Sequence, residues 1–139
     1  MKVLISLFLG VLVFGLLAGT RSQATNLVGS TWVGHSERRL EADTLFIKTD
    51  STVEHYSEEV SFVYRGDYTV SKDTLIIRYK TQALEVNDVS NLEHNQVYKY
   101  LIRTDSLYLV ELSSKRNGVW VDRTDYLKAY HNLNLGRLQ

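Results

Sequence analysis

The sequence predicts an all-β protein whose strands form an antiparallel meander that closes, or nearly closes, into a barrel. Nine tyrosines and many Val, Ile and Thr residues are present, and proline is absent, a composition that favours strands over helices. Apolar and polar residues alternate over several stretches, which is the period of a half-buried strand. A short phrase that begins with Asp recurs three times and marks turns.

About eight strands are expected along the chain. Short polar stretches join most of them, as in hairpins. Because closure into a ring removes exposed strand edges, eight antiparallel strands at this spacing favour a closed barrel. A two-sheet sandwich is the alternative. The approximate strand ranges are 31–39, 43–49, 52–57, 60–70, 74–81, 96–103, 106–112 and 119–127.

The longest expected strand, 60–70, shows the clearest alternation. Phe62, Tyr64 and Tyr68 share one face, and mostly polar residues share the other. Gly66 lies near its centre, where a residue without a side chain permits a bulge or a bend. We therefore expect this strand to turn a corner of the barrel at Gly66.

The repeated phrase starts at Asp43, Asp73 and Asp105, and each copy continues with Thr or Ser and then a hydrophobic run. Asp followed by Thr or Ser can bond its own backbone and form a tight turn. Each copy is therefore interpreted as a turn followed by a strand.

Two segments do not follow the strand pattern. Residues 82–95 are polar and rich in Asn, and we interpret them as a long loop or a short helix. In the tail, Tyr and Leu residues within 126–133 have helix-like spacing, and Gly136 offers a stop. The tail is therefore expected to form a short C-terminal helix, with a ninth strand as the alternative.

The first 24 residues are typical of a cleavable signal peptide. Lys2 supplies a positive charge, and a mostly apolar run extends to Leu17. Ser22 and Ala24 place small residues before a cleavage site that follows Ala24. The alternative, a membrane anchor, needs about 20 apolar residues, more than this run holds. We therefore expect a signal peptide, 1–24, and a single domain, 25–139, that is secreted or periplasmic and has no stable membrane anchor after processing.

Composition excludes several classes of function. The signal peptide holds Lys2 and Arg21, and the rest of the chain has 14 basic residues against 16 acidic ones, a net charge of −2. No broad positive field remains to hold nucleic acid. The chain has no cysteine, which excludes disulfides, thiolate metal ligands and cysteine nucleophiles. The domain must therefore be stabilised by its core alone.

The segment Leu27-Val28-Gly29-Ser30-Thr31-Trp32 is similar to the entry of the first strand in lipocalin-like and fatty-acid-binding-like barrels. In those barrels a Gly precedes, by one residue, a Trp that plugs one end, whereas two residues separate Gly29 from Trp32 here. With its repeated Asp-Thr/Ser-Leu turn, the chain resembles the lipocalin-like domains of Bacteroidetes secreted proteins over residues 27–127. The resemblance implies a barrel and favours a lipophilic ligand, and it assigns no ligand or catalytic residue.

Aromatic residues on the apolar strand faces are the candidate ligand contacts. Tyrosine rings offer apolar surface with a few hydroxyls, which suits a small hydrophobic or amphipathic molecule. An eight-stranded barrel is also narrow enough for side chains alone to fill it, so the same rings have a second interpretation as a filled core. The candidates are Trp32, Phe62, Tyr64, Tyr68, Tyr79 and Tyr100.

No pattern of catalytic or metal-binding residues stands out. The four histidines lack ligand-like spacing, the serines lack a Gly-x-Ser-x-Gly context, and no phosphate-binding glycine loop occurs. We therefore expect no enzyme, no metal and no cofactor. The leading hypothesis is a secreted lipocalin-like protein that binds a small hydrophobic or amphipathic molecule inside the barrel. The alternatives are a barrel that binds or inhibits another protein, and an accessory envelope domain with a filled core.

The signal peptide gives a direct test. Processing after Ala24 should leave a mature protein that begins at Thr25, because Ser22 and Ala24 present small side chains to the peptidase. N-terminal sequencing of secreted or periplasmic material checks this expectation. A full-length chain retained in the membrane contradicts it.

Overall fold

The computed structural model describes residues 27–35, 42–57, 61–84, 92–125 and 134–139. The expected signal peptide lies outside these residues. No helix within them is long and apolar enough to cross a membrane. They form nine strands, which are β1 (Thr31–His35), β2 (Ala42–Ile47), β3 (Thr52–Ser57), β4 (Phe62–Ser71), β5 (Thr74–Ala83), β6 (Leu92–Ile102), β7 (Ser106–Arg116), β8 (Val119–Asp122) and β9 (Leu135–Arg137).

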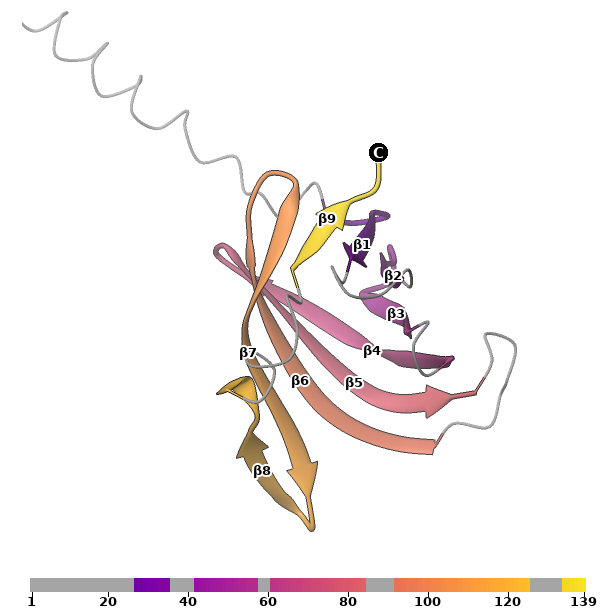
Figure 1. Ribbon diagram of the computed structural model, residues 1–139, viewed down its shortest axis with the longest axis vertical. Coiled ribbons are helices and arrows are strands. Elements are labelled where there is room, and N and C mark those ends of the chain that lie inside the picture. Colours follow the sequence, from indigo (N-terminus) through magenta and orange to yellow (C-terminus); the bar gives the residue numbers. More distant parts are fainter. Residues whose placement is uncertain (1–26, 36–41, 58–60, 85–91, 126–133) are drawn as a thin grey trace, which may run out of the picture.

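Eight of these strands close into a barrel (Figure 1). Strands β1 to β7 pair in sequence order, each antiparallel to the next. Strand β7 also pairs with β9, which places Ser106 opposite Gly136 and Leu107 opposite Leu135, and β9 pairs with β1. The predicted antiparallel barrel is confirmed, and the sandwich alternative is wrong.

The expected eighth strand does not belong to the ring. Strand β8 ends at Asp122, earlier than the predicted 119–127, and it pairs with β7 alone. The Asp122 carboxylate accepts a hydrogen bond from the Thr124 backbone N–H at 2.8 Å. The Thr124 hydroxyl accepts one from the Leu112 backbone N–H at 3.0 Å. These contacts turn the chain away from the strand direction and tie it to β7.

Strand β9 takes the eighth place in the ring, so the ninth strand considered for the tail is present. Gly136, the expected helix stop, lies inside this strand and pairs with Val33 and Ser106. The residues with helix-like spacing, 126–133, lie outside the described residues. A strand of three residues is too short to show an alternating pattern, which is why the sequence did not distinguish it.

The polar segment 82–95 contains more strand than expected. Strand β5 continues to Ala83 and β6 begins at Leu92, and Gln82 lies opposite Leu92. Pairing satisfies the backbone groups whatever the side chains are, so polar residues are accommodated at these strand ends. The expectation of a loop or helix is therefore wrong at both ends of the segment, and residues 85–91 lie outside the described part.

Gly66 lets β4 approach β5 closely. The register between the two strands shifts between Arg65 and Gly66, as in a bulge. A Cβ atom at Gly66 would lie 1.9 Å from the carbonyl oxygen of Arg78, well inside van der Waals contact. The predicted bulge is confirmed, and its cause is the close approach of the two backbones.

The start of β1 and the end of β9 lie at one end of the barrel, called here the Trp32 end. The turns β2–β3, β4–β5 and β6–β7 share it because the strands alternate in direction. Backbone hydrogen bonds from Tyr68 to Ser51, from Ile102 to Asp73 and from Arg137 to Asp105 link these turns to neighbouring strands. At the opposite end, called here the far end, β1, β3 and β5 end and β2, β4 and β6 begin.

Trp32 plugs the end that carries its name. Its side chain is 1 % exposed, and its Nε1 donates to Ser30 Oγ at 2.7 Å. The Ser30 hydroxyl donates to the Leu27 carbonyl, and the Arg137 guanidinium lies 5.9 Å from the centre of the indole ring. Trp32 belongs to one buried core cluster, whose other members are Leu27, Leu45, Ile47, Val53, Leu75, Ile77, Tyr79, Tyr100, Ile102, Leu107 and Leu135.

Loss of the Trp32 plug should destabilise the barrel strongly. Truncation of a buried Trp to Ala typically costs about 3–5 kcal/mol, and domains of this kind have about 5–15 kcal/mol in total. Urea unfolding of Trp32→Ala measures the loss. Trp120→Ala is the matched control, because Trp120 is exposed on β8 and its removal should have little effect. Equal stability of the two variants would contradict the plug.

The close approach at Gly66 is tested in the same way. Gly66→Ala should cost about 1–3 kcal/mol or more, because the new methyl group meets backbone that must move. Gly136→Ala is the control, since the nearest atom to its added Cβ is the Val33 carbonyl oxygen at 3.8 Å, an ordinary contact. Thermal or urea unfolding separates them. Similar midpoints for both variants would contradict the bulge geometry.

Candidate functional site

The barrel interior holds a set of rings that we call the aromatic cluster. Successive rings have centroids between 4.7 and 6.3 Å apart, the closest pair being Tyr64 and His94. Tilted and edge-on arrangements predominate, as aromatic pairs prefer. The members are His55 from β3, Phe62 and Tyr64 from β4, Tyr79 from β5, and His94, Tyr98 and Tyr100 from β6.

The register of the strands puts these rings on one face. His55 lies opposite Tyr64, and Tyr98 lies opposite Ile77. Residues directly opposite each other in an antiparallel pair project to the same side of the sheet. Ile77 is fully buried, so that side is the barrel interior. The cluster therefore follows from period-two alternation along β3, β4, β5 and β6.

His55 and Tyr79 form the buried polar centre of the cluster. The Tyr79 hydroxyl and His55 Nδ1 share a hydrogen bond of 3.0 Å. The other ring nitrogen, Nε2, lies 3.9 Å from Oδ2 of Asp43. Either neutral tautomer of His55 keeps this hydrogen bond, since the Tyr79 hydroxyl can donate to Nδ1 or accept from it.

Burial sets the protonation states of the cluster. It raises the pKa of Tyr79, Tyr98 and Tyr100 well above the usual range, with a smaller contribution from the Asp43 charge, so these hydroxyls keep their protons. Burial also lowers the pKa of His55, and Asp43 opposes that change. His55 is therefore a neutral hydrogen-bonding group near neutral pH.

Two ring nitrogens in the cluster are buried without a hydrogen-bond partner, Nε2 of His55 and Nε2 of His94. The 3.9 Å between His55 Nε2 and Asp43 is too long for a hydrogen bond. An unsatisfied buried polar group costs about 1–3 kcal/mol. Such atoms are places where a bound molecule with polar groups would gain hydrogen bonds.

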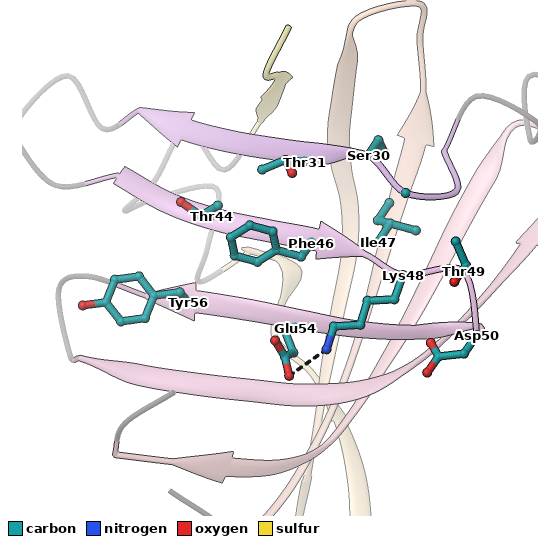
Figure 2. Close-up of a pocket in the computed structure, with 11 residues that line it drawn as sticks. Ser30, Thr31, Thr44, Phe46, Ile47, Lys48, Thr49, Asp50, Glu54 and Tyr56 are labelled. Atoms are coloured by element: carbon teal, nitrogen blue, oxygen red, sulfur yellow. Dashed lines mark ion pairs between the residues drawn. The ribbon is translucent and has the colours of Figure 1, made fainter. Parts of the chain in front are cut away.

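A second candidate site lies on the outer face of β1, β2 and β3, and we call it the outer pocket (Figure 2). Its volume is about 740 Å³. Phe46 and Tyr56 supply ring surface, and Lys48 and Glu54 form an ion pair of 2.9 Å across it. The further lining residues are Gly29, Ser30, Thr31, Thr44, Ile47, Thr49 and Asp50.

The outer pocket is separate from the aromatic cluster because Phe46 alternates with two interior residues of β2. Leu45 and Ile47 are buried, whereas Phe46 is exposed. Lys48 and Glu54 largely neutralise each other, which leaves ring surface, threonine hydroxyls and the Asp50 carboxylate as the pocket's chemistry. It could hold a small amphipathic group at the barrel surface.

The structure distributes the six predicted contact residues over two places. Phe62, Tyr64, Tyr79 and Tyr100 belong to the aromatic cluster, with Tyr79 and Tyr100 fully buried and the other two half-buried. Tyr68 lies toward the Trp32 end, where its hydroxyl donates to the Lys48 carbonyl at 3.2 Å. Trp32 itself forms the plug and does not reach the cluster's ring contacts.

The predicted contact residues did not include four members of this site, Asp43, His55, His94 and Tyr98. The phrase at Asp43 was interpreted as a turn followed by a strand, and the turn is wrong, because Asp43 lies inside β2, within the predicted strand 43–49. The same interpretation is confirmed for Asp73 and Asp105, which precede β5 and β7. The usable signal was alternation, since Asp43 is two residues before Leu45 and therefore shares the interior face.

Comparisons with known proteins give no relative. No protein-family model matches the chain, and neither the curated proteins nor the solved structures contain a match.

The buried histidines should make stability depend on pH. The pKa of His94 is also lowered, mainly by burial and against a hydrogen bond with Gln96. Because both folded-state pKa values lie below 6.5, the usual value for histidine, the unfolded chain binds protons first as pH falls through that value. Stability should therefore be fully present above about pH 7 and decrease toward about pH 5.

Urea unfolding across this range, in the wild type and in a His55→Gln, His94→Gln double variant, measures the contribution. The double variant should lose less stability on acidification, since glutamine does not titrate. An identical loss in both proteins would show that these histidines are not held neutral by the fold.

Proposed function

We propose that this protein is an exported, lipocalin-like binding protein that holds a small hydrophobic or amphipathic molecule against the aromatic cluster, at the far end of the barrel. The closed barrel with its interior ring surface supports the proposal. The observation that carries it is the pair of buried ring nitrogens, on His55 and His94, that have no hydrogen-bond partner.

The arrangement of burial along the cluster suits a ligand that enters from the far end. Tyr79 and Tyr100 are 2 % exposed and would form the floor. Phe62 and Tyr64 are half-buried and would form the walls, offering ring faces that water now contacts. A molecule seated there would cover apolar surface and could pair with the free ring nitrogens, the two contributions that favour binding in such sites.

Binding is proposed in preference to catalysis. The Tyr79 hydroxyl keeps its proton because burial raises its pKa, and His55 Nδ1 is engaged with that hydroxyl. The pair therefore serves as a fixed hydrogen-bonding element, and a nucleophile activated by His55 is not part of the proposal.

A neutral fluorescent aromatic probe, phenylnaphthylamine, tests the proposed site. It should bind the mature protein reversibly, with one molecule per chain. Tyr64→Leu should weaken binding about tenfold, because it removes the central ring face of the wall. Phe46→Leu is the matched control for the outer pocket and should leave affinity unchanged, and thermal melting checks that both variants fold.

The two variants separate the candidate sites. If Phe46→Leu weakens binding and Tyr64→Leu does not, the ligand occupies the outer pocket and the proposed site is wrong. If the wild type binds no probe, the interior is a filled core and the binding proposal fails.

A protein-interaction barrel is a second candidate function, favoured by the β7–β8 hairpin. This hairpin extends away from the barrel (Figure 1), and β8 pairs only with β7. Val119 and Trp120 on it are 64 % and 51 % exposed, and exposed aromatic residues are typical of interaction surfaces. Trp120→Ser should then impair partner capture and leave probe binding unchanged, whereas unchanged capture would remove the hairpin from consideration.

A further inference from the structure

The far end of the barrel interior carries a carboxylate, Asp43. It lies on the same face of β2 as the buried residues Leu45 and Ile47. Its neighbour across the pair with β1 is Gly34, which has no side chain to cover it. The Asp43 side chain is 31 % exposed, so it borders both the buried cluster and solvent.

Asp43 has no cationic partner among the described residues. Its ion-pair neighbour is His55, at 3.9 Å, and burial keeps that ring neutral by lowering its pKa. The described ion pairs of lysines engage other carboxylates, namely Lys48 with Glu54, Lys80 with Asp67 and Lys99 with Glu111. This part of the interior therefore holds one negative charge that the described side chains do not neutralise.

A second, independent observation points to a ligand at the same place. The His55 side chain is 9 % exposed, and its Nε2 faces Asp43 without a hydrogen-bond partner. Buried polar atoms are normally satisfied by protein or water. Within the described residues, a carboxylate without a cationic partner thus lies beside a buried ring nitrogen without a hydrogen-bond partner.

Aromatic rings surround His55, the residue in contact with Asp43, and its ring centroid lies 5.9 Å from that of Tyr64 and 5.6 Å from that of Tyr79. The rings of Tyr64 and Tyr79 lie 5.9 Å apart, and those of Tyr79 and Tyr98 lie 5.1 Å apart. The faces of such rings are negative and attract cations, most strongly where water is excluded. Within the described residues, no three His, Asp or Glu side chains come together to hold a metal ion. Ring faces with one carboxylate suit an organic ammonium group better than a metal.

We infer that the molecule bound at the aromatic cluster is a small organic amine in its ammonium form, with an aromatic or aliphatic body. This inference rests on the proposed function and names the chemical class of its ligand. The ammonium N–H groups donate to the Asp43 carboxylate, while the body lies against Tyr64 and its neighbouring rings. Neutralisation of the Asp43 charge gives the amine its advantage over a neutral molecule of the same shape.

Three ligands with one ring and a short chain test the inference: phenethylamine, phenethyl alcohol and hydrocinnamate. Calorimetry on the mature protein, near pH 7, should rank the amine first, at least about tenfold tighter than the alcohol, with the acid weakest. Asp43→Asn should reduce the affinity for the amine to that for the alcohol, and should leave the alcohol unaffected. Glu54→Gln is the matched control, since it removes a carboxylate of the outer pocket, and the preference for the amine should persist.

The outcomes distinguish this inference from the proposed function. If the alcohol or the acid binds as tightly as the amine, the ammonium inference is wrong and the binding function stands. If none of the three binds and phenylnaphthylamine does not bind either, the proposed function fails as well. The ranking in the wild type decides the question even if Asp43→Asn does not fold. If Glu54→Gln no longer prefers the amine to the alcohol, the amine binds in the outer pocket and the inference is wrong.

Discussion

The pairing of β9 with β7 and β1 keeps water from the interior of the barrel. Without it, β1 and β7 would each present an open edge, and the ring would be a curled sheet with a hydrated face. The closing strand has only three residues, Leu135 to Arg137. It nevertheless bonds on both sides, and Leu135 enters the core at 4 % exposure. Because the chain has no disulfide, this short strand carries the closure by hydrogen bonds and packing.

The interior face of the closed ring changes character along the barrel axis. From the Trp32 end to the far end, β2 presents Ile47, Leu45 and then Asp43, and β5 presents Leu75, Ile77 and then Tyr79. Strand β3 follows the same order with Val53 and His55. The aliphatic half provides the core that stabilises the fold, while the polar and aromatic half provides the groups that a ligand would contact.

Alternation along single strands predicted much of this arrangement from sequence. It gave the inward faces of Phe62, Tyr64 and Tyr79, and the glycine at 66 predicted the bulge because only glycine permits that backbone approach. The interpretation of the repeated Asp phrase as a turn failed at Asp43, which lies in β2 two residues before Leu45 and shares its interior face. His55 and His94 lie 39 positions apart in the sequence, and only the pairing of β3 through β6 brings both to Tyr64. No single-strand pattern contains that information.

The short C-terminal strand was beyond sequence reasoning for a related reason. Its residues join the sheet because β1 and β7 leave a gap of the right width, which is a property of the assembled ring and not of Leu135-Gly136-Arg137 itself. The expected eighth strand ends early for a local reason, the bonds of Asp122 and Thr124. Tertiary context thus decides which segment becomes the strand between β7 and β1.

Binding and stability share groups in this interior. Tyr79 and Tyr100 belong to the same buried core cluster as Trp32, so the floor of the proposed site also stabilises the fold. The buried nitrogens of His55 and His94 that have no hydrogen-bond partner reduce the free energy of unfolding. A ligand that satisfies the same groups binds only the folded chain, so its binding free energy adds directly to stability. Groups that lower the stability of the ligand-free barrel are therefore the ones through which ligand binding adds most to its stability.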